Sequence, residues 1–164
     1  MNFSVTQFGK PLSEDKYTWD AETKTFSTTE DYLVLDFSKL TKCTFNTGSW
    51  CIFITGGWCN FNTGSWCTFN TNSNCTFNTG DYCTFNIFDS CILKVGKNCV
   101  VVRKDLFEVI QIPTLPEHKK IEINEPGERG YKTIDDLKII TIDGEDIKIS
   151  YTIFENIMKL LEQQ

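Results

Sequence analysis

Residues 43–98 read CTFNTGSW CIFITGGW CNFNTGSW CTFNTNSN CTFNTGDY CTFNIFDS CILKVGKN, seven successive octads that all begin with Cys. The third position is Phe in six octads and Leu in the seventh, and the sixth position is Gly in five of them. An eighth octad begins at Cys99 and breaks into VVVRKD. Such a regular repeat indicates identical units that stack along one axis.

Each octad combines a short strand with a turn. Around the Cys, inward and outward residues alternate with a period of two, as in Trp-Cys-Thr-Phe-Asn, which is typical of a strand. Asn-Thr-Gly-Ser follows, and we expect the Gly to adopt a left-handed backbone conformation there. A strand of about four residues cannot bury its apolar face alone, so the units must stack.

Two octads would complete one flattened coil, with the odd octads on one face and the even octads on the other. Neighbouring coils would then lie about 4.8 Å apart, the strand spacing of any sheet. The alternative is a squarer coil with one octad per side. We therefore predict a mainly β fold: a short two-sided parallel β-solenoid with an N-terminal cap and a small C-terminal β-hairpin plus helix.

The first and third positions of the octads are predicted to point inward, because a small Cys beside a large Phe fills a thin interior. We expect reduced, structural thiols and no metal, since disulfide frameworks and metal sites both have irregular Cys spacing. The predicted core residues are Cys43, Cys51, Cys59, Cys67, Cys75, Cys83, Cys91, Cys99, Phe45, Phe53, Phe61, Phe69, Phe77 and Phe85.

Charge separates the repeat from its flanks. Residues 43–99 contain only four charged side chains, at Asp81, Asp89, Lys94 and Lys97. This contrast predicts three parts: an N-terminal β cap or leader (1–42), the octapeptide-repeat solenoid (43–102) and a C-terminal β-hairpin and helix module (103–164).

Alternating residues predict strands in both flanks. Residues 17–26 (YTWDAETKTF) predict a hairpin, and residues 32–38 (YLVLDFS) predict a strand leading into the first coil. After the repeat, residues 100–112 predict a continued strand and residues 119–124 another, with Pro113 and Pro116 in the connection between them.

The C-terminal segment predicts a hairpin followed by a helix. Residues 138–150 (KIITIDGEDIKIS) alternate on both sides of Asp143-Gly144, a strong turn signal. Ser150 or Thr152 can cap the helix, and four apolar residues share one helical face: Ile153, Ile157, Leu160 and Leu161. We expect this face to pack on the hairpin; the alternative is an exposed docking helix.

Composition narrows the classes of function. The net charge of −6 disfavours nucleic-acid binding through phosphate contacts. There is no run of about eighteen apolar residues and no basic segment before an apolar one, so we expect neither a membrane span nor a secretory signal. His118 is the only His, and no glycine-rich phosphate loop is present. We expect no catalytic residues, no cofactor and no enzyme activity.

The eighth position of each octad is predicted to point outward. Before the even strands it carries Trp50, Trp66 and Tyr82, about 4.8 Å apart, with Ile52 beside them. This outward aromatic ladder is the predicted binding surface. It could contact another subunit, it could be covered by the N-terminal hairpin with Trp19, or it could bind a glycan.

The Cys-Thr-Phe-x-Thr-Gly octads, after a leader that reads YTWD at 17–20 and TFSTTEDYLVLDFS at 25–38, resemble a group of tailed-bacteriophage proteins. The resemblance covers about residues 11–110 and is specific in the repeat and the leader. It implies a virus-associated role. The ending IITIDGEDIKIS followed by a helix is a looser similarity to phage proteins.

These observations together predict a non-enzymatic phage structural or adhesion module, such as part of a fibre or decoration protein. It would self-associate or bind another virion protein, in the host cytoplasm during synthesis and in the virion after assembly. One alternative is a carbohydrate- or protein-binding module that uses the ladder. Another is ice binding by outward Thr44, Thr68, Thr76 and Thr84, a ladder interrupted by Ile52 and Asn60.

Overall fold

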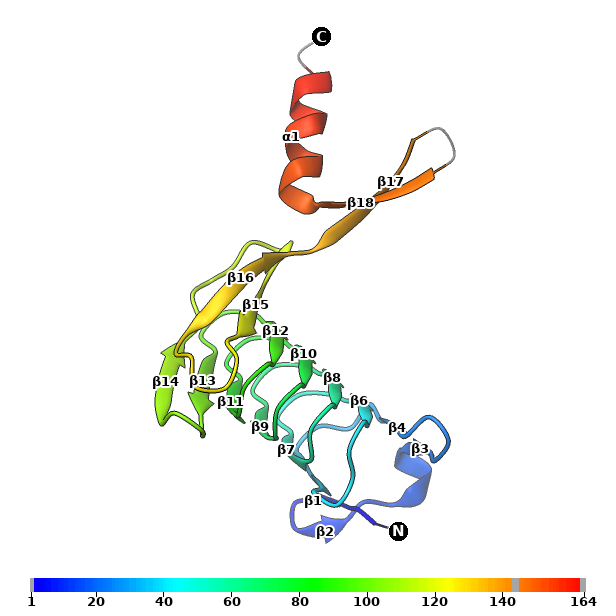
Figure 1. The fold of residues 1–164 in the computed structure, drawn as a ribbon. Coiled ribbons are helices and arrows are strands. Elements are labelled where there is room, and N and C mark those ends of the chain that lie inside the picture. Colours follow the sequence, from blue (N-terminus) through cyan, green and yellow to red (C-terminus); the bar gives the residue numbers. More distant parts are fainter. Residues whose placement is uncertain (1, 143–144, 163–164) are drawn as a thin grey trace.

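Short strands wind into a flattened solenoid with a hairpin at each end, and a further hairpin and helix extend from its C-terminal end (Figure 1). The structure is a computed structural model that describes residues 2–142 and 145–162. The two long walls of the solenoid are sheets of eight strands each, called sheet A and sheet B here.

Sheet A has the strand order β14-β13-β11-β9-β7-β5-β1-β2. Its strands are β1 (Ser4–Gln7), β2 (Lys10–Pro11), β5 (Leu33–Phe37), β7 (Ile52–Thr55), β9 (Thr68–Asn70), β11 (Thr84–Ile87), β13 (Val100–Arg103) and β14 (Glu108–Gln111).

Sheet B has the order β16-β15-β12-β10-β8-β6-β4-β3. Its strands are β3 (Thr18–Asp20), β4 (Thr25–Ser27), β6 (Thr44–Asn46), β8 (Asn60–Asn62), β10 (Thr76–Asn78), β12 (Ile92–Lys94), β15 (Lys119–Ile123) and β16 (Tyr131–Asp135). A short 3-10 helix (Glu14–Lys16) precedes β3. The C-terminal elements are β17 (Leu137–Ile142), β18 (Glu145–Ser150) and α1 (Tyr151–Leu161).

Residues sixteen positions apart pair in parallel, so two octads make one coil. Phe45 pairs with Phe61 and Phe61 with Phe77 in sheet B, while Phe53 pairs with Phe69 in sheet A. This register confirms the predicted two-sided solenoid and shows that the squarer coil is wrong. Five coils lie within the described residues, because β4 and β5 already stack in parallel on β6 and β7.

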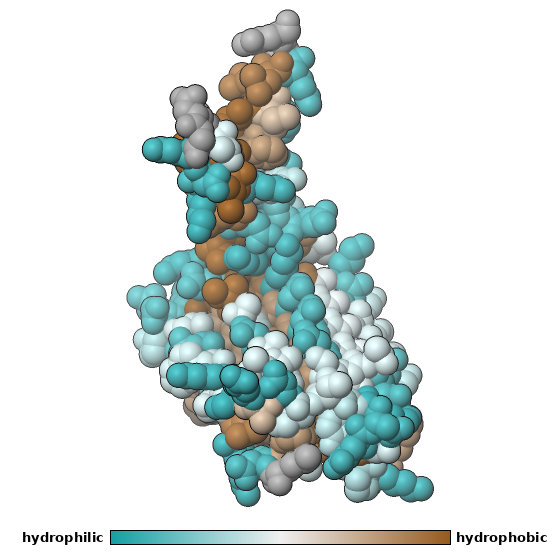
Figure 2. All heavy atoms as spheres, turned by 90° about the vertical axis from the view of Figure 1, so that its right-hand side faces the viewer, coloured by the Kyte–Doolittle hydropathy of each residue, from teal (hydrophilic) through white to brown (hydrophobic). Residues whose placement is uncertain are grey.

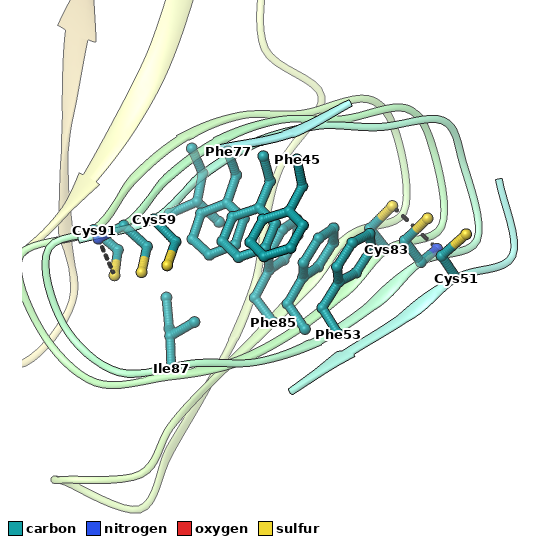
Figure 3. Close-up of a cluster of buried hydrophobic side chains, with 14 of the residues drawn as sticks. Phe45, Cys51, Phe53, Cys59, Phe77, Cys83, Phe85, Ile87 and Cys91 are labelled. Atoms are coloured by element: carbon teal, nitrogen blue, oxygen red, sulfur yellow. Dashed lines mark hydrogen bonds between the residues drawn. The ribbon is translucent and has the colours of Figure 1, made fainter. Parts of the chain in front are cut away.

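Two columns of Phe rings fill the interior (Figure 3). Within a column the rings lie parallel, with centroids 4.9 Å apart for Phe61 and Phe77 and 5.0 Å for Phe69 and Phe85. Between columns they meet edge to face, as Phe61 and Phe69 do at 5.1 Å. Both arrangements are favourable for aromatic pairs. All predicted core Cys and Phe residues are buried.

The Cys thiols lie at the two ends of this flattened interior, one column at each corner (Figure 3). The Cys83 Sγ accepts a bond from the Cys67 backbone N–H at 3.5 Å and lies 3.7 Å from the Gly64 carbonyl oxygen, to which the thiol donates. Cys99 repeats this pattern one coil later, with the Cys83 N–H and the Gly80 carbonyl. The thiol thus accepts a corner N–H that an Ala would leave unpaired, whereas the Gly64 and Gly80 carbonyl oxygens also accept the backbone N–H groups of Gly80 and Gly96.

Antiparallel hairpins close both ends of the solenoid. At the N-terminal end, the Phe3 ring stacks on Phe37 at 4.3 Å, and Trp19 lies 5.6 Å from the same ring. At the C-terminal end, β13–β14 and β15–β16 extend the two sheets. Each hairpin puts an antiparallel strand over the last coil, which limits the open edge that a solenoid would otherwise expose.

Arg103 seals the C-terminal end of the core. Its strand position matches that of buried Ile87, and its side chain is fully buried. The guanidinium pairs with both carboxylate oxygens of Asp105 and donates to the Glu128 carbonyl oxygen at 2.6 Å. A buried Arg is tolerated only with such a set of partners.

In the flanking segments, the structure confirms some of the predicted elements and contradicts others. The 17–26 hairpin is confirmed as β3–β4, and the C-terminal hairpin and helix are confirmed. The predicted Asp143-Gly144 turn lies outside the described residues. The continued strand over 100–112 is wrong: β13 and β14 form a hairpin, because the chain reverses at Lys104–Phe107. Strands β1, β2 and β16 lie outside the elements predicted from the sequence.

We expect Phe69→Ala to lower the free energy of unfolding by about 3–5 kcal/mol, the usual cost of deleting a core aromatic. Phe69 is fully buried between Phe53 and Phe85. Phe107→Ala is the matched control, because that ring is 93% exposed and its loss should be almost neutral. Equal urea midpoints for Phe69→Ala and the parent would show that the third position does not pack inward.

The thiols should be free and unreactive in the folded protein. All eight thiols are buried, so a reagent in the solvent does not reach them while the chain is folded. We expect eight thiols to titrate with a disulfide reagent in denaturant and few without it. Cys67→Ala should fold with a loss of about 1 kcal/mol. Recovery of four disulfides from a reducing cytoplasm would contradict this.

Candidate interaction surfaces

The eighth position of the octad lies in the left-handed region of the backbone, not in the strand. Trp50, Trp58 and Trp66 have φ of 60°, 57° and 61°, and Tyr82 has 57°. In the described repeat, the predicted left-handed Gly at position six is therefore wrong. The left-handed conformation is energetically unfavourable for an L residue with a bulky side chain. Asn adopts it more easily and occupies the same position at Asn74 and Asn98.

Gly is required at the sixth position for a different reason: the neighbouring coil approaches the backbone closely there. The Ser65 backbone N–H donates to the Ser49 hydroxyl at 3.1 Å, and the Asp81 N–H donates to the Ser65 hydroxyl at 2.9 Å. A Cβ at Gly64 would collide with the Ser49 hydroxyl, and one at Gly80 with that of Ser65. The Gly column leaves room for this ladder of hydroxyls.

The aromatic ladder lies along this corner of the solenoid. The rings of Trp50 and Trp66 are 4.8 Å apart and 1° from parallel, and those of Trp66 and Tyr82 are 4.2 Å apart and 7° from parallel. Tyr32 stacks on Trp50 at 5.7 Å, and Phe8 on Tyr32 at 5.7 Å. The structure thus brings the predicted Trp50, Trp66 and Tyr82 together and adds two rings from the leader.

The leader rings are the members that sequence reasoning missed. A usable signal was present, because Tyr32 lies eighteen residues before Trp50 and immediately before the Leu33–Phe37 strand that pairs with the Ile52 strand. Phe8 follows β1, which joins the sheet in the antiparallel sense, so its place could not be read from the repeat.

Stacking changes what the ladder can bind. Each inner ring has both faces covered by its neighbours, so mainly ring edges remain open, although Trp50, Trp66 and Tyr82 are each about 45% exposed. A sugar stacks on a free ring face. The geometry of the ladder therefore stabilises the corner of the coil and leaves no row of free ring faces for a glycan, since both faces of Trp50 and Trp66 are covered.

Two other expectations about this surface can be resolved. The N-terminal hairpin does not cover the ladder, because Trp19 packs on the end of the core against Phe3 and Phe37. The predicted Ile52 is exposed on the outer face of sheet A, between Val34 and Thr68 in register. It belongs to a small apolar patch with Val34 and Ile54 beside the ladder.

The C-terminal arm, defined as β17, β18 and α1, exposes large apolar side chains more densely along the chain than the solenoid does. Figure 2 shows apolar side chains, in brown, gathered on the helix and the hairpin. Eight large apolar residues of the arm are between 40% and 65% exposed, namely Leu137, Ile139, Ile147, Ile153, Ile157, Met158, Leu160 and Leu161. No residue of α1 is buried, so the expected packing of its apolar face on the hairpin is wrong.

Both faces of the β17–β18 ribbon carry apolar residues. Directly paired residues share a face. Leu137 and Ile139 point to one face, opposite Ser150 and Lys148. Ile140, paired with Ile147, points to the other, where Lys138 lies over the Tyr151 and Phe154 rings near the start of the helix.

Polar contacts hold the base of the arm on the solenoid. The Asp136 N–H donates to the His118 carbonyl oxygen at 2.8 Å, and the Tyr151 N–H donates to the Asp136 carbonyl oxygen at 2.9 Å. The Asp136 carboxylate pairs with Lys94 at 2.6 Å and with Lys120 at 3.3 Å. The hydrogen bond from Lys94 lowers the pKa of Asp136. The Tyr151 ring stacks on the half-buried His118 at 4.5 Å.

Among the described residues, no group of three or more His, Cys, Asp and Glu side chains is placed to share a metal ion. Neither described helical segment combines the length and apolar character that a membrane crossing requires. Comparison with family models, with curated proteins and with solved structures finds no match for this chain.

The ladder should contribute to stability through its stacked rings. We expect Trp66→Asn to lower the free energy of unfolding by about 1–3 kcal/mol, because two ring contacts of roughly 0.5–1.5 kcal/mol each are lost. Trp58→Asn is the matched control: it has the same octad position and φ of 57°, and in the described structure no aromatic ring stacks on it. Asn relieves the left-handed backbone, so this variant should equal or exceed the parent.

Urea unfolding followed by circular dichroism measures both variants. Equal destabilisation of Trp66→Asn and Trp58→Asn would show that ring stacking does not distinguish the two corners.

Proposed function

We propose that this protein is a non-enzymatic structural component of a virus particle, in which a stiff solenoid presents an attachment arm. The observation that carries the proposal is the uncovered apolar surface of the arm. The bacteriophage resemblance of the repeat and leader supports the viral setting.

The hairpin and helix of the arm are expected to be only marginally stable in water without further packing. A two-stranded hairpin is marginally stable at best in water, and a helix of fewer than about 12–15 residues is marginal without tertiary packing. Here a two-stranded ribbon and an eleven-residue helix expose most of their apolar side chains. Exposed apolar surface of this extent usually marks an interaction site.

The solenoid suits a supporting role. Every coil is hydrogen-bonded to its neighbours, both ends are closed by hairpins, and the core is continuous from Phe26 to Val101. A stack of this kind is stiff along its axis and holds the arm at one end (Figure 1).

The alternatives receive less support. A glycan rail on the ladder would need a row of free ring faces, and stacking covers both faces of Trp50 and Trp66. The outward threonines are divided between two sheets: Thr68 and Thr84 in sheet A lie between Ile52 and Val100, and Asn60 separates Thr44 from Thr76 in sheet B. Neither sheet presents the regular Thr array that the ice-binding alternative requires.

The test is whether washed virus particles contain the chain and whether the arm is needed. Cells that produce the particles would express the parent, an arm variant (Ile157→Asp with Leu160→Asp) or a control (Val109→Asp). Val109 is 70% exposed on the solenoid, so the control adds a charge elsewhere. We expect the parent and control, but not the arm variant, in salt-washed particles. Absence of the parent from particles would refute the proposal.

A further inference from the structure

We infer that a second copy of this chain covers the arm, with the helix of each copy packed on the hairpin of the other. The inference deepens the proposed function and rests on the arm being its attachment surface. It follows from two apolar surfaces that one chain leaves unmatched: the ribbon face that carries Leu137 and Ile139, and the apolar face of α1.

The helix does not cover this ribbon face within its own chain. Strand β18 ends at Ser150 and α1 begins at Tyr151, so no linker separates them. The Ser150 hydroxyl caps the helix by accepting the Ile153 N–H at 3.3 Å, and Lys138 holds the first turn through the Tyr151 and Phe154 rings. The Lys138 contacts lie on the ribbon face opposite Leu137 and Ile139, and the helix leaves the ribbon at an angle (Figure 1).

The amount of exposed surface fits a pair of chains. The seven exposed apolar residues on the uncovered ribbon face and on α1 amount to on the order of 700 Å², close to what each partner contributes to a standard protein interface. The apolar arc of α1 includes both Ile153-Ile157-Leu160 and Met158-Leu161. This arc is wider than the seam of a two-helix coiled coil, so it calls for a sheet or several neighbours rather than one helix.

Charged side chains lie on both surfaces. On the uncovered ribbon face Lys148 lies opposite Ile139, and the Asp146 carboxylate accepts a hydrogen bond from the Thr141 hydroxyl at 2.8 Å. Glu155 and Glu162 lie seven residues apart on α1, beside the Met158 side of its apolar arc. An acidic helix edge therefore meets a basic ribbon residue when the helix of one copy lies on the ribbon of the other. In a two-fold symmetric dimer, the helix of each copy covers the ribbon of the other. Both apolar surfaces of both chains are then buried, and the assembly is closed.

Sedimentation of the purified full chain tests the inference directly. We expect twice the 18.9 kDa of one chain at micromolar concentration. Ile157→Asp with Leu160→Asp should weaken the dimer by about a hundredfold or more, because charges would enter its apolar centre. Phe107→Asp, on a ring 93% exposed on the solenoid, should leave it unchanged. Circular dichroism and urea unfolding show whether the solenoid of each variant is folded.

A charge-reversed pair identifies the contact. One chain carries Glu155→Lys with Glu162→Lys, and the other carries Lys148→Glu. Each should dimerise weakly alone, because like charges meet, whereas the mixture should form a heterodimer with both contacts restored.

The inference would be overturned if the parent were a monomer, or if it formed a trimer or larger assembly. It would also be overturned if each charge-reversed variant dimerised alone as well as in the mixture. A monomer that still enters particles through its arm would leave the proposed function standing and assign the arm to a different virion protein. The dimer is tested by sedimentation and the proposed function by the content of the particles, so either one can be refuted without the other.

Discussion

Parallel pairing between residues sixteen apart determines the rest of the solenoid, because it places each side chain above its counterpart in the coil below. Phe lies on Phe, Cys on Cys and, at one corner, Trp on Trp. Stacking of this kind favours rings and small hydrogen-bonding groups and disfavours like charges. It explains why the repeat contains so few charged residues, and why Asn78 donates to Asn62, and Asn86 to Asn70, on the outer faces.

The corners show how one register serves several chemical needs. The thiol column pairs corner N–H and C=O groups inside, and the Ser column pairs N–H groups nearer the surface. Gly is required where the Ser hydroxyl of one coil meets the backbone of the next. The left-handed residue then turns the chain into the next strand, and its side chain projects outward. Stacked aromatic rings offset part of the cost of that backbone.

The ends of the solenoid and the arm differ in how much of their apolar surface is covered by residues of the same chain. Phe3 and Trp19 cover the core at one end, and Arg103 with its partners seals the other. The arm retains a dense set of exposed apolar side chains, although its base is fixed by Asp136 and by the His118–Tyr151 stack. The arm, with its densely exposed apolar side chains, is therefore held at one end of a solenoid whose core is closed at both ends.

The coil, the inward Cys and Phe, the outward position eight, the C-terminal hairpin and the capped helix could all be predicted from the sequence. These features depend on local periodicity and on neighbouring residues, which a single sequence displays. The tertiary structure decided that Tyr32 and Phe8 extend the ladder, that Trp19 covers the core instead, and that Arg103 is buried under residues 125–128. It also decided that α1 leaves its hairpin uncovered, because Ser150 joins strand to helix without a linker. Such outcomes depend on which distant segments meet and at what angle, and the period of a repeat carries no information about either.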